Sequence, residues 1–171
     1  IARERNLALI VDEVFLDYAF AEDSRRLGSS AGTSGVLTFT LNGISKLAGL
    51  PQLKLGWIVV SGPPSDVTGR VSPAQEAAER LEILCDTFLS VNMPVQAALP
   101  ELLRAGEQIR AQILRRVNSN AAALRELFRN SPGSVLDTEG GWSAIIRVPR
   151  TRSDEEWALE LLEQTGVYLY P

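Results

Sequence analysis

An unbroken apolar run from Leu7 to Val11 sets the first limit on how this chain folds. Its residues are consecutively apolar instead of alternating with polar ones, and the run ends at the acidic pair Asp12 and Glu13. This pattern is typical of a strand in a parallel sheet that is covered on both faces. We therefore expect an α/β fold with this strand buried inside it.

Two more short strands are predicted within the first sixty residues, at positions 36–41 and 57–60. Both segments are apolar and rich in β-branched residues, and glycine, asparagine and proline turn signals bound them. The first third of the chain therefore predicts an edge region of a sheet.

Helical periodicity follows the third predicted strand. Ser72 is placed to cap a helix whose first residue is Pro73, and Gln75 has the position that closes a capping box with Ser72. Apolar residues then recur at helical spacing as far as Phe88. This spacing predicts a helix with one buried face.

A second, longer helix is predicted from Met93 to Asn130, with a kink or a restart at Pro100. Thirty helical residues would span about 45 Å. A helix of this length usually bridges two substructures, so we expect it to connect the sheet region to a separate unit.

The last forty residues predict a small α+β unit. Alternating apolar and polar residues indicate a half-buried strand at 142–148. Ser153 and Glu156 form a capping box for a helix that ends at Gly166, and a strand-like run occupies 167–171. Because the chain starts without methionine and stops in that run, we expect a piece of a longer protein.

Composition excludes several functions. The 171 residues include 17 basic and 21 acidic side chains, which gives a net charge of −4 and no basic face for a nucleic-acid partner. No apolar run approaches membrane-spanning length, so no membrane partner is expected.

The sequence has no histidine and one cysteine, Cys85. This excludes serine–histidine and cysteine–histidine hydrolases and any internal disulfide, and no metal site is predicted. Lacking a signal peptide, the protein is expected in the cytoplasm.

Two short segments carry the candidate chemistry. Asp12 follows the first predicted strand, and Ser45 and Lys46 follow the second, 34 positions after Asp12. Ligands of open α/β sheets bind at the carboxyl ends of parallel strands. The apolar neighbours of Lys46 favour the neutral amine that attacks carbonyl groups. Pyridoxal phosphate needs a lysine for its aldehyde, an anion for its pyridine nitrogen, and donors or cations for its phosphate. Lys46 and Asp12 could meet the first two needs, and Ser45 with Lys54 could bind the phosphate.

Each signal is unspecific by itself. An acidic pair after a strand is typical of a solvated turn, and a lone Ser-Lys pair is equally weak. Their combination at this spacing is what favours a cofactor site.

The segments Val11–Phe15 and Gly43–Trp57 resemble the fold-type I, class I/II aminotransferases, and the resemblance covers essentially the whole chain. It implies part of the mostly parallel large-domain sheet of a pyridoxal-phosphate-dependent transferase, then a long interdomain helix and part of a small α+β domain. The corresponding ranges are 1–115 for the large domain and 116–171 for the small one.

The resemblance also implies residue roles. Asp12 pairs with the pyridine nitrogen, Lys46 holds the cofactor as a Schiff base and moves protons, and Ser45 and Lys54 contact the phosphate. Two positions depart from the family pattern: Phe15 stands where a tyrosine is usual, and Lys54 where an arginine is usual. The family's upstream phosphate loop, its ring-stacking aromatic and its substrate-carboxylate arginine have no counterpart here. We therefore expect the isolated chain to be inactive.

The leading hypothesis is an aminotransferase that acts on α-amino acids and 2-oxo acids, as a homodimer. One alternative keeps pyridoxal phosphate but performs lyase or decarboxylase chemistry on the same scaffold. Another is a non-catalytic, aminotransferase-like sensing domain of a regulator.

Overall fold

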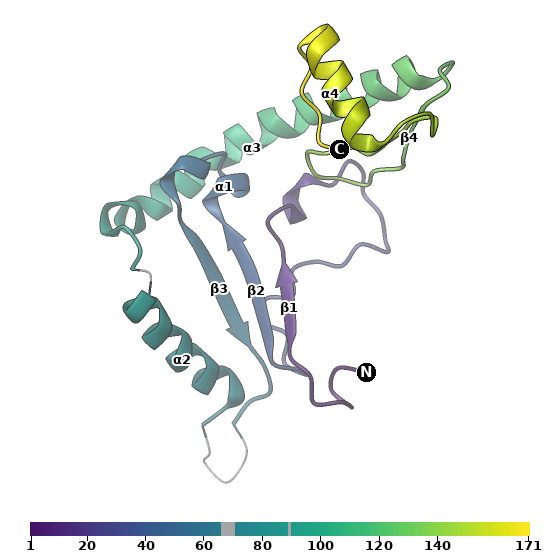
Figure 1. Cartoon of the computed structure of the whole chain (residues 1–171). Helices are drawn as coiled ribbons and strands as arrows, with labels where there is room; N and C mark the ends of the chain where they lie inside the picture. The colour runs from purple at the N-terminus through teal and green to yellow at the C-terminus, as the bar shows by residue number, and fades with distance from the viewer. Residues whose placement is uncertain (66–70, 89) are drawn as a thin grey trace. The chain divides into compact units, whose positions relative to one another are not determined.

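The computed structural model describes residues 1–65, 71–88 and 90–171 (Figure 1). The chain forms two compact units. Unit 1 contains residues 1–117 and 139–142, and unit 2 contains residues 118–138 and 143–171. Helices and strands alternate along unit 1, so the expected α/β class is confirmed.

A three-stranded sheet with the order β1-β2-β3 organises unit 1 (Figure 1). Strand β1 (Leu9–Asp12) runs parallel to β2 (Thr38–Gly43), and β2 pairs antiparallel with β3 (Gly56–Ser61). All three predicted strands are therefore present, and the first one lies in a parallel pair as expected.

The prediction that the first strand is buried on both faces is wrong for this chain. Ile10 is 74% exposed and Leu9 is 39% exposed. The reason is that the main packing partner of β1 among the described residues is its ladder neighbour β2, and no helix covers its faces as the unbroken apolar pattern would require.

A small core lies where β2 leaves the sheet. The short helix α1 (Ile44–Leu47) follows β2 directly, and the 3₁₀ turn η2 (Pro51–Leu53) leads from it to β3. Ile44, Ala48 and Leu55 are the buried residues of this core. Partly buried residues of the long helix pack against them: Val95, Leu99, Leu102 and Leu103. The core therefore fixes α1 between the sheet and that helix.

Gly106 of the long helix lies directly against Ala48, the residue that follows α1. A Cβ atom at this position would lie 2.6 Å from the Ala48 Cβ and 2.8 Å from the Ala48 Cα. We expect Gly106→Ala to lower the free energy of unfolding by about 2 kcal/mol, because overpacking outweighs the gain of about 1 kcal/mol in helix propensity. Urea unfolding measures this change. Gln108→Ala, at an exposed position of the same helix, is the control; a Gly106→Ala chain as stable as the original would contradict the account.

Helix α2 (Pro73–Phe88) starts as predicted but is less buried than predicted. The Ser72 hydroxyl accepts a hydrogen bond from the Gln75 backbone N–H at 3.1 Å, while the Gln75 side chain donates to Glu79 instead of closing the box. No residue of α2 is buried, Ala77 and Leu81 are only partly buried, and Phe88 is 78% exposed, so the predicted buried face is wrong.

Helix α3 (Met93–Phe128) continues through Pro100 without the predicted restart. Proline removes one backbone hydrogen bond and crowds the preceding turn. The neighbours of Pro100 on the apolar face, Leu99 and Leu103, pack on the buried core, and this packing offsets the cost of the proline. None of the helices among the described residues is both long and apolar enough to cross a membrane.

Unit 2 contains a two-stranded antiparallel ladder and a capped helix. Strands β4 (Ser134–Val135) and β5 (Ile146–Arg147) pair, so the predicted strand at 142–148 is only two residues long. Helix α4 (Asp154–Thr165) has the predicted capping box between Ser153 and Glu156 and ends at Gly166 in the left-handed conformation. Residues 167–171 form no strand among the described residues, because no ladder partner lies beside them.

Candidate functional site

Three of the four predicted site residues, Asp12, Ser45 and Lys46, lie at the carboxyl ends of two adjacent parallel strands. Parallel pairing sets Asp12, the last residue of β1, opposite Leu41 of β2. Asp12 is exposed, and its Oδ1 accepts a hydrogen bond from the backbone N–H of Val14 at 3.1 Å. The carboxylate thus stands at a carboxyl end of the sheet, where ligands of α/β folds bind.

Ser45 and Lys46 lie at this same edge because β2 turns at once into α1. The turn requires Gly43: a Cβ atom there would lie 2.9 Å from the Leu55 carbonyl oxygen, which accepts a hydrogen bond from Ile44 N at 3.1 Å. Ser45 and Lys46 are both partly buried.

Lys54, the other predicted phosphate ligand, follows η2 and is exposed. Its backbone has φ 52° and ψ 49°, the left-handed conformation that residues other than glycine seldom adopt. The sequence has only two lysines, so Lys46 and Lys54 can be compared directly in labelling experiments.

Two aromatic rings lie beside the amine of Lys46, and a third ring packs against both of them. The Lys46 Nζ lies 4.6 Å from the centre of the Trp142 ring and 5.6 Å from that of the Phe15 ring. Tyr18 completes the group, with ring-centre distances of 5.2 Å to Trp142 and 6.2 Å to Phe15, in edge-to-face geometry. We call Phe15, Tyr18 and Trp142 the aromatic cluster.

Tyr18 joins the aromatic cluster to the backbone of α1. Its side chain is fully buried, and its hydroxyl donates a hydrogen bond to the Lys46 carbonyl oxygen at 2.7 Å. Burial raises the pKa of Tyr18, and the nearby Asp17 carboxylate adds to this, while the Arg110 guanidinium opposes it. The hydroxyl therefore stays protonated and keeps donating.

Sequence patterns gave no role to Tyr18 or to Trp142. Tyr18 follows Asp12 closely in the chain, and its proximity to the site is a local signal. Trp142 lies almost a hundred residues from Lys46, and only the fold brings the two together.

The segment 139–142 reaches the aromatic cluster by docking on residues 18–20. Phe20 N donates to the Glu139 carbonyl oxygen, and Gly141 N donates to the Tyr18 carbonyl oxygen, both at 2.9 Å. Ala19 and Gly140 form an isolated antiparallel bridge. A Cβ at Gly140 would lie 2.4 Å from the Tyr18 carbonyl oxygen, so this docking requires glycine.

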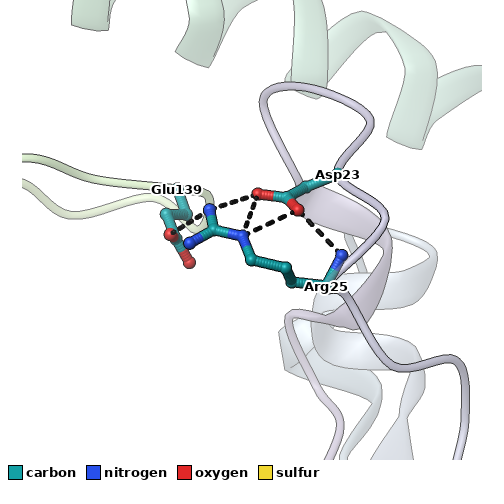
Figure 2. A network of polar contacts seen from close by, with 3 residues as sticks. All are labelled: Asp23, Arg25 and Glu139. Atoms are coloured by element: carbon teal, nitrogen blue, oxygen red, sulfur yellow. Dashed lines mark hydrogen bonds and ion pairs between the residues drawn. The ribbon is translucent and has the colours of Figure 1, made fainter.

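An exposed ion network lies beside this docking, formed by Asp23, Arg25 and Glu139 (Figure 2). Arg25 Nε donates to both Asp23 oxygens, at 3.0 and 3.2 Å, and Arg25 also lies 4.0 Å from Glu139 Oε1. Hydrogen bonds from the Arg25 side chain hold the pKa of Asp23 below its ordinary value. Because these groups are exposed, the network contributes little stability compared with the backbone docking.

Glu13 is buried, which the sequence did not predict. It is 7% exposed, and its carboxylate accepts hydrogen bonds from the Ser29 hydroxyl at 2.6 Å and from the Ser30 N–H and hydroxyl at 2.6 and 2.8 Å. The Ser30 hydroxyl also contacts the Thr40 hydroxyl of β2 at 2.8 Å. Glu13 therefore fixes a loop against the sheet directly beside Asp12.

This arrangement predicts a loss of stability in acid. Burial raises the pKa of Glu13, but the hydrogen bonds from Ser29 and Ser30 outweigh burial and leave the pKa below the ordinary 4.5. The folded state therefore binds its proton more weakly than the unfolded state, so the stabilisation is complete above pH 4.5 and is lost as the pH falls through the lowered pKa.

We expect Glu13→Gln to lower the free energy of unfolding at pH 7 by about 2 kcal/mol and to flatten the pH dependence below 4.5. Urea unfolding at a series of pH values measures both effects. Glu22→Gln, which changes an exposed carboxylate, is the matched control. An unchanged acid transition in Glu13→Gln would contradict this role.

The residues present fit pyridoxal phosphate by their chemistry. An exposed carboxylate at a strand end suits a protonated pyridine nitrogen, an amine at the same edge suits the aldehyde, and a hydroxyl and a cation suit the phosphate. A tyrosine is usual in the family at the position of Phe15. Tyr18 does not supply the hydroxyl that is missing there, because its own hydroxyl already donates to the Lys46 carbonyl oxygen. No group of three or more histidine, cysteine or acidic side chains suited to a metal ion occurs among the described residues.

The parallel strands, the lysine-bearing helix after β2 and the long helix behind it form part of the fold of a pyridoxal-phosphate-dependent transferase. A family model described as aminotransferase class I and II matches residues 1–171. The chain belongs to the class I and II aminotransferases.

Relatives and solved structures agree with this assignment. The glutamate-pyruvate aminotransferase AlaA of Haemophilus influenzae is 28% identical over 99% of this chain and 42% of its own length. The α-aminoadipate aminotransferase LysN of Thermus thermophilus, solved with N-(5'-phosphopyridoxyl)-L-leucine, is 26% identical, with a TM-score of 0.68 over 95% of this chain and 40% of that one.

The aromatic aminotransferase of Pyrococcus horikoshii has a TM-score of 0.77 at 16% identity, over 99% of this chain and 43% of that one. At this identity the likeness shows the fold alone. This chain spans about two fifths of the length of these relatives.

Proposed function

We propose that this chain is part of an enzyme that transfers an amino group between an α-amino acid and a 2-oxo acid, with pyridoxal phosphate held by Lys46. The observation that carries the proposal is the position of Asp12 and Lys46 at one edge of the sheet, after two parallel strands. The whole-chain match to the aminotransferase family supports it.

We assign roles by the chemistry of each side chain. The Lys46 amine would hold the cofactor aldehyde and, once the amino group of the substrate had taken its place there, would accept the α-proton of the substrate and return it at another carbon. Asp12 keeps the pyridine nitrogen protonated. The Ser45 hydroxyl and the Lys54 ammonium bind phosphate oxygens, Lys54 as a point charge and not as a bidentate fork. Bound pyridoxal phosphate supplies the electron sink for the carbanion that forms when the α-proton leaves.

We further propose that residues 1–115 belong to the cofactor-binding large domain and 116–171 to the small domain of a longer protein. That protein acts as a homodimer in the cytoplasm. The 171-residue chain by itself is expected to be inactive, since it lacks counterparts of the family's upstream phosphate loop and substrate-carboxylate arginine.

An absorbance spectrum after addition of pyridoxal phosphate tests the cofactor assignment. We expect a new band near the edge of the visible range in the longer protein, and we expect Lys46→Ala to remove it. A folded longer protein that gives no such band would overturn the proposal. Product analysis after incubation with an amino acid and a 2-oxo acid then separates amino transfer from elimination or decarboxylation.

A further inference from the structure

Lys46 is held at two points by different members of the aromatic cluster. Tyr18 donates to the Lys46 carbonyl oxygen at 2.7 Å, which holds the main chain of α1. Trp142 presents its ring to the other end of the same residue, 4.6 Å from Nζ. Without these two contacts, the four-carbon side chain of the lysine would rotate freely.

Trp142 is itself held precisely enough to serve this purpose. The bridge between Ala19 and Gly140 and the hydrogen bond from Gly141 to Tyr18 fix the backbone just before it. Edge-to-face contacts with Phe15 at 5.6 Å and Tyr18 at 5.2 Å fix the ring. An indole face is the best aromatic partner for an ammonium group.

We propose that Trp142 is a positioning residue for Lys46: its indole face lies over the free amino group and limits where the lysine side chain can point before it meets the cofactor or the substrate. The catalytic meaning of this contact rests on the proposed function. The contact itself belongs to this chain's own residues. The contact between Trp142 and Lys46 limits the orientations of the lysine side chain in advance. It therefore reduces the conformational entropy lost when the amine reaches the cofactor or the substrate.

Competitive acylation of the two lysines tests the proposal without any cofactor. Brief treatment of the 171-residue chain with acetic anhydride, followed by mass spectrometry of the peptides, gives the ratio of labelling at Lys46 to labelling at Lys54. Acylation requires that the reagent reach the amino group. The ring face attracts the amino group and covers one side of it, so loss of the ring raises labelling at Lys46, while exposed Lys54 is an internal reference.

Two variants of Trp142 separate the ring face from simple bulk. Trp142→Leu keeps an apolar side chain without a π face, and we expect it to raise the Lys46 to Lys54 ratio about fivefold, equivalent to about 1 kcal/mol. Trp142→Phe keeps a ring, and we expect its ratio to stay within about twofold of the original. Ile145→Ala, an exposed position three residues on, is expected to leave the ratio unchanged.

An unchanged ratio in Trp142→Leu, or an equal rise in Trp142→Leu and Trp142→Phe, would overturn the proposal. Should the leucine variant fail to fold by far-UV circular dichroism, Gly140→Ala provides a second test, because its Cβ would collide with the Tyr18 carbonyl oxygen and displace the segment that carries Trp142. It is expected to raise the ratio as well, and an unchanged ratio there also overturns the proposal. The labelling result is independent of the cofactor spectrum, so a failure of the proposed function is recognised separately.

Discussion

Lys46→Ala is expected to lower amino transfer by the longer protein about a thousandfold or more. The substitution removes both the amine that holds the cofactor and the group that moves the substrate proton, and general acid–base catalysis alone is worth about 10²–10⁴-fold. Lys46 is the partly buried lysine at the edge of the sheet, after the parallel strand β2. The measurement is the initial rate of 2-oxo acid formation from a panel of amino acids at saturating pyridoxal phosphate.

Lys46→Arg is the matched control, because it keeps a long cationic side chain but cannot hold the aldehyde or shuttle a proton near neutral pH. We expect the arginine variant to be as inactive as the alanine variant. Lys54→Ala is expected to weaken cofactor affinity while leaving turnover measurable at high cofactor concentration. Activity of Lys46→Ala within tenfold of the original would contradict the assignment.

Asp12→Asn is expected to lower the rate about a hundredfold. The substitution keeps the shape of the side chain and its hydrogen bond from Val14 but removes the negative charge. With the proposed role, the Asp12 carboxylate would pair with the pyridinium of pyridoxal phosphate away from water, and loss of one member of such a pair costs several kcal/mol. The same rate assay measures the effect.

Two further variants, Asp12→Glu and Asp17→Asn, are the controls for this result. The glutamate variant keeps the charge at a changed distance and is expected to retain more activity than Asp12→Asn. Asp17 is an exposed acidic residue in the turn η1 (Leu16–Tyr18), and its neutralisation is expected to leave the rate within about twofold. Equal effects of Asp12→Asn and Asp17→Asn would show that Asp12 has no particular role.

The local features of the fold could be predicted from the sequence. Apolar runs marked all three strands, and the residues Ser72, Ser153 and Gly166 marked the helix ends at which the structure uses them. These signals are local because a cap or a short strand depends on a few adjacent side chains. Family resemblance added the class of protein.

Long-range features could not be predicted in this way. Periodicity indicated that Leu9 and Ile10 suit a buried strand, but burial depends on neighbouring segments, and in the described part of this chain no helix covers the faces of β1. Pro100 stays inside a helix because packing against the core compensates for it.

The same limit applies to the site. Asp12, Ser45 and Lys46 could be proposed from the sequence because each lies in one of two short segments with a recognisable local pattern. The contact of Trp142 with Lys46 depends on the docking of segment 139–142 on residues 18–20, which no local pattern encodes. Glu13 similarly depends on a loop that returns to the sheet through Ser29 and Ser30.

Chemical trapping of the cofactor tests the central claim most directly. The longer protein is incubated with pyridoxal phosphate, reduced with borohydride and digested, and the peptides are analysed by mass spectrometry. Of the two lysines in this chain, our account predicts the phosphopyridoxyl group on Lys46 and its absence from Lys54. A folded protein that carries the group on Lys54, equally on both lysines, or on neither would contradict the account.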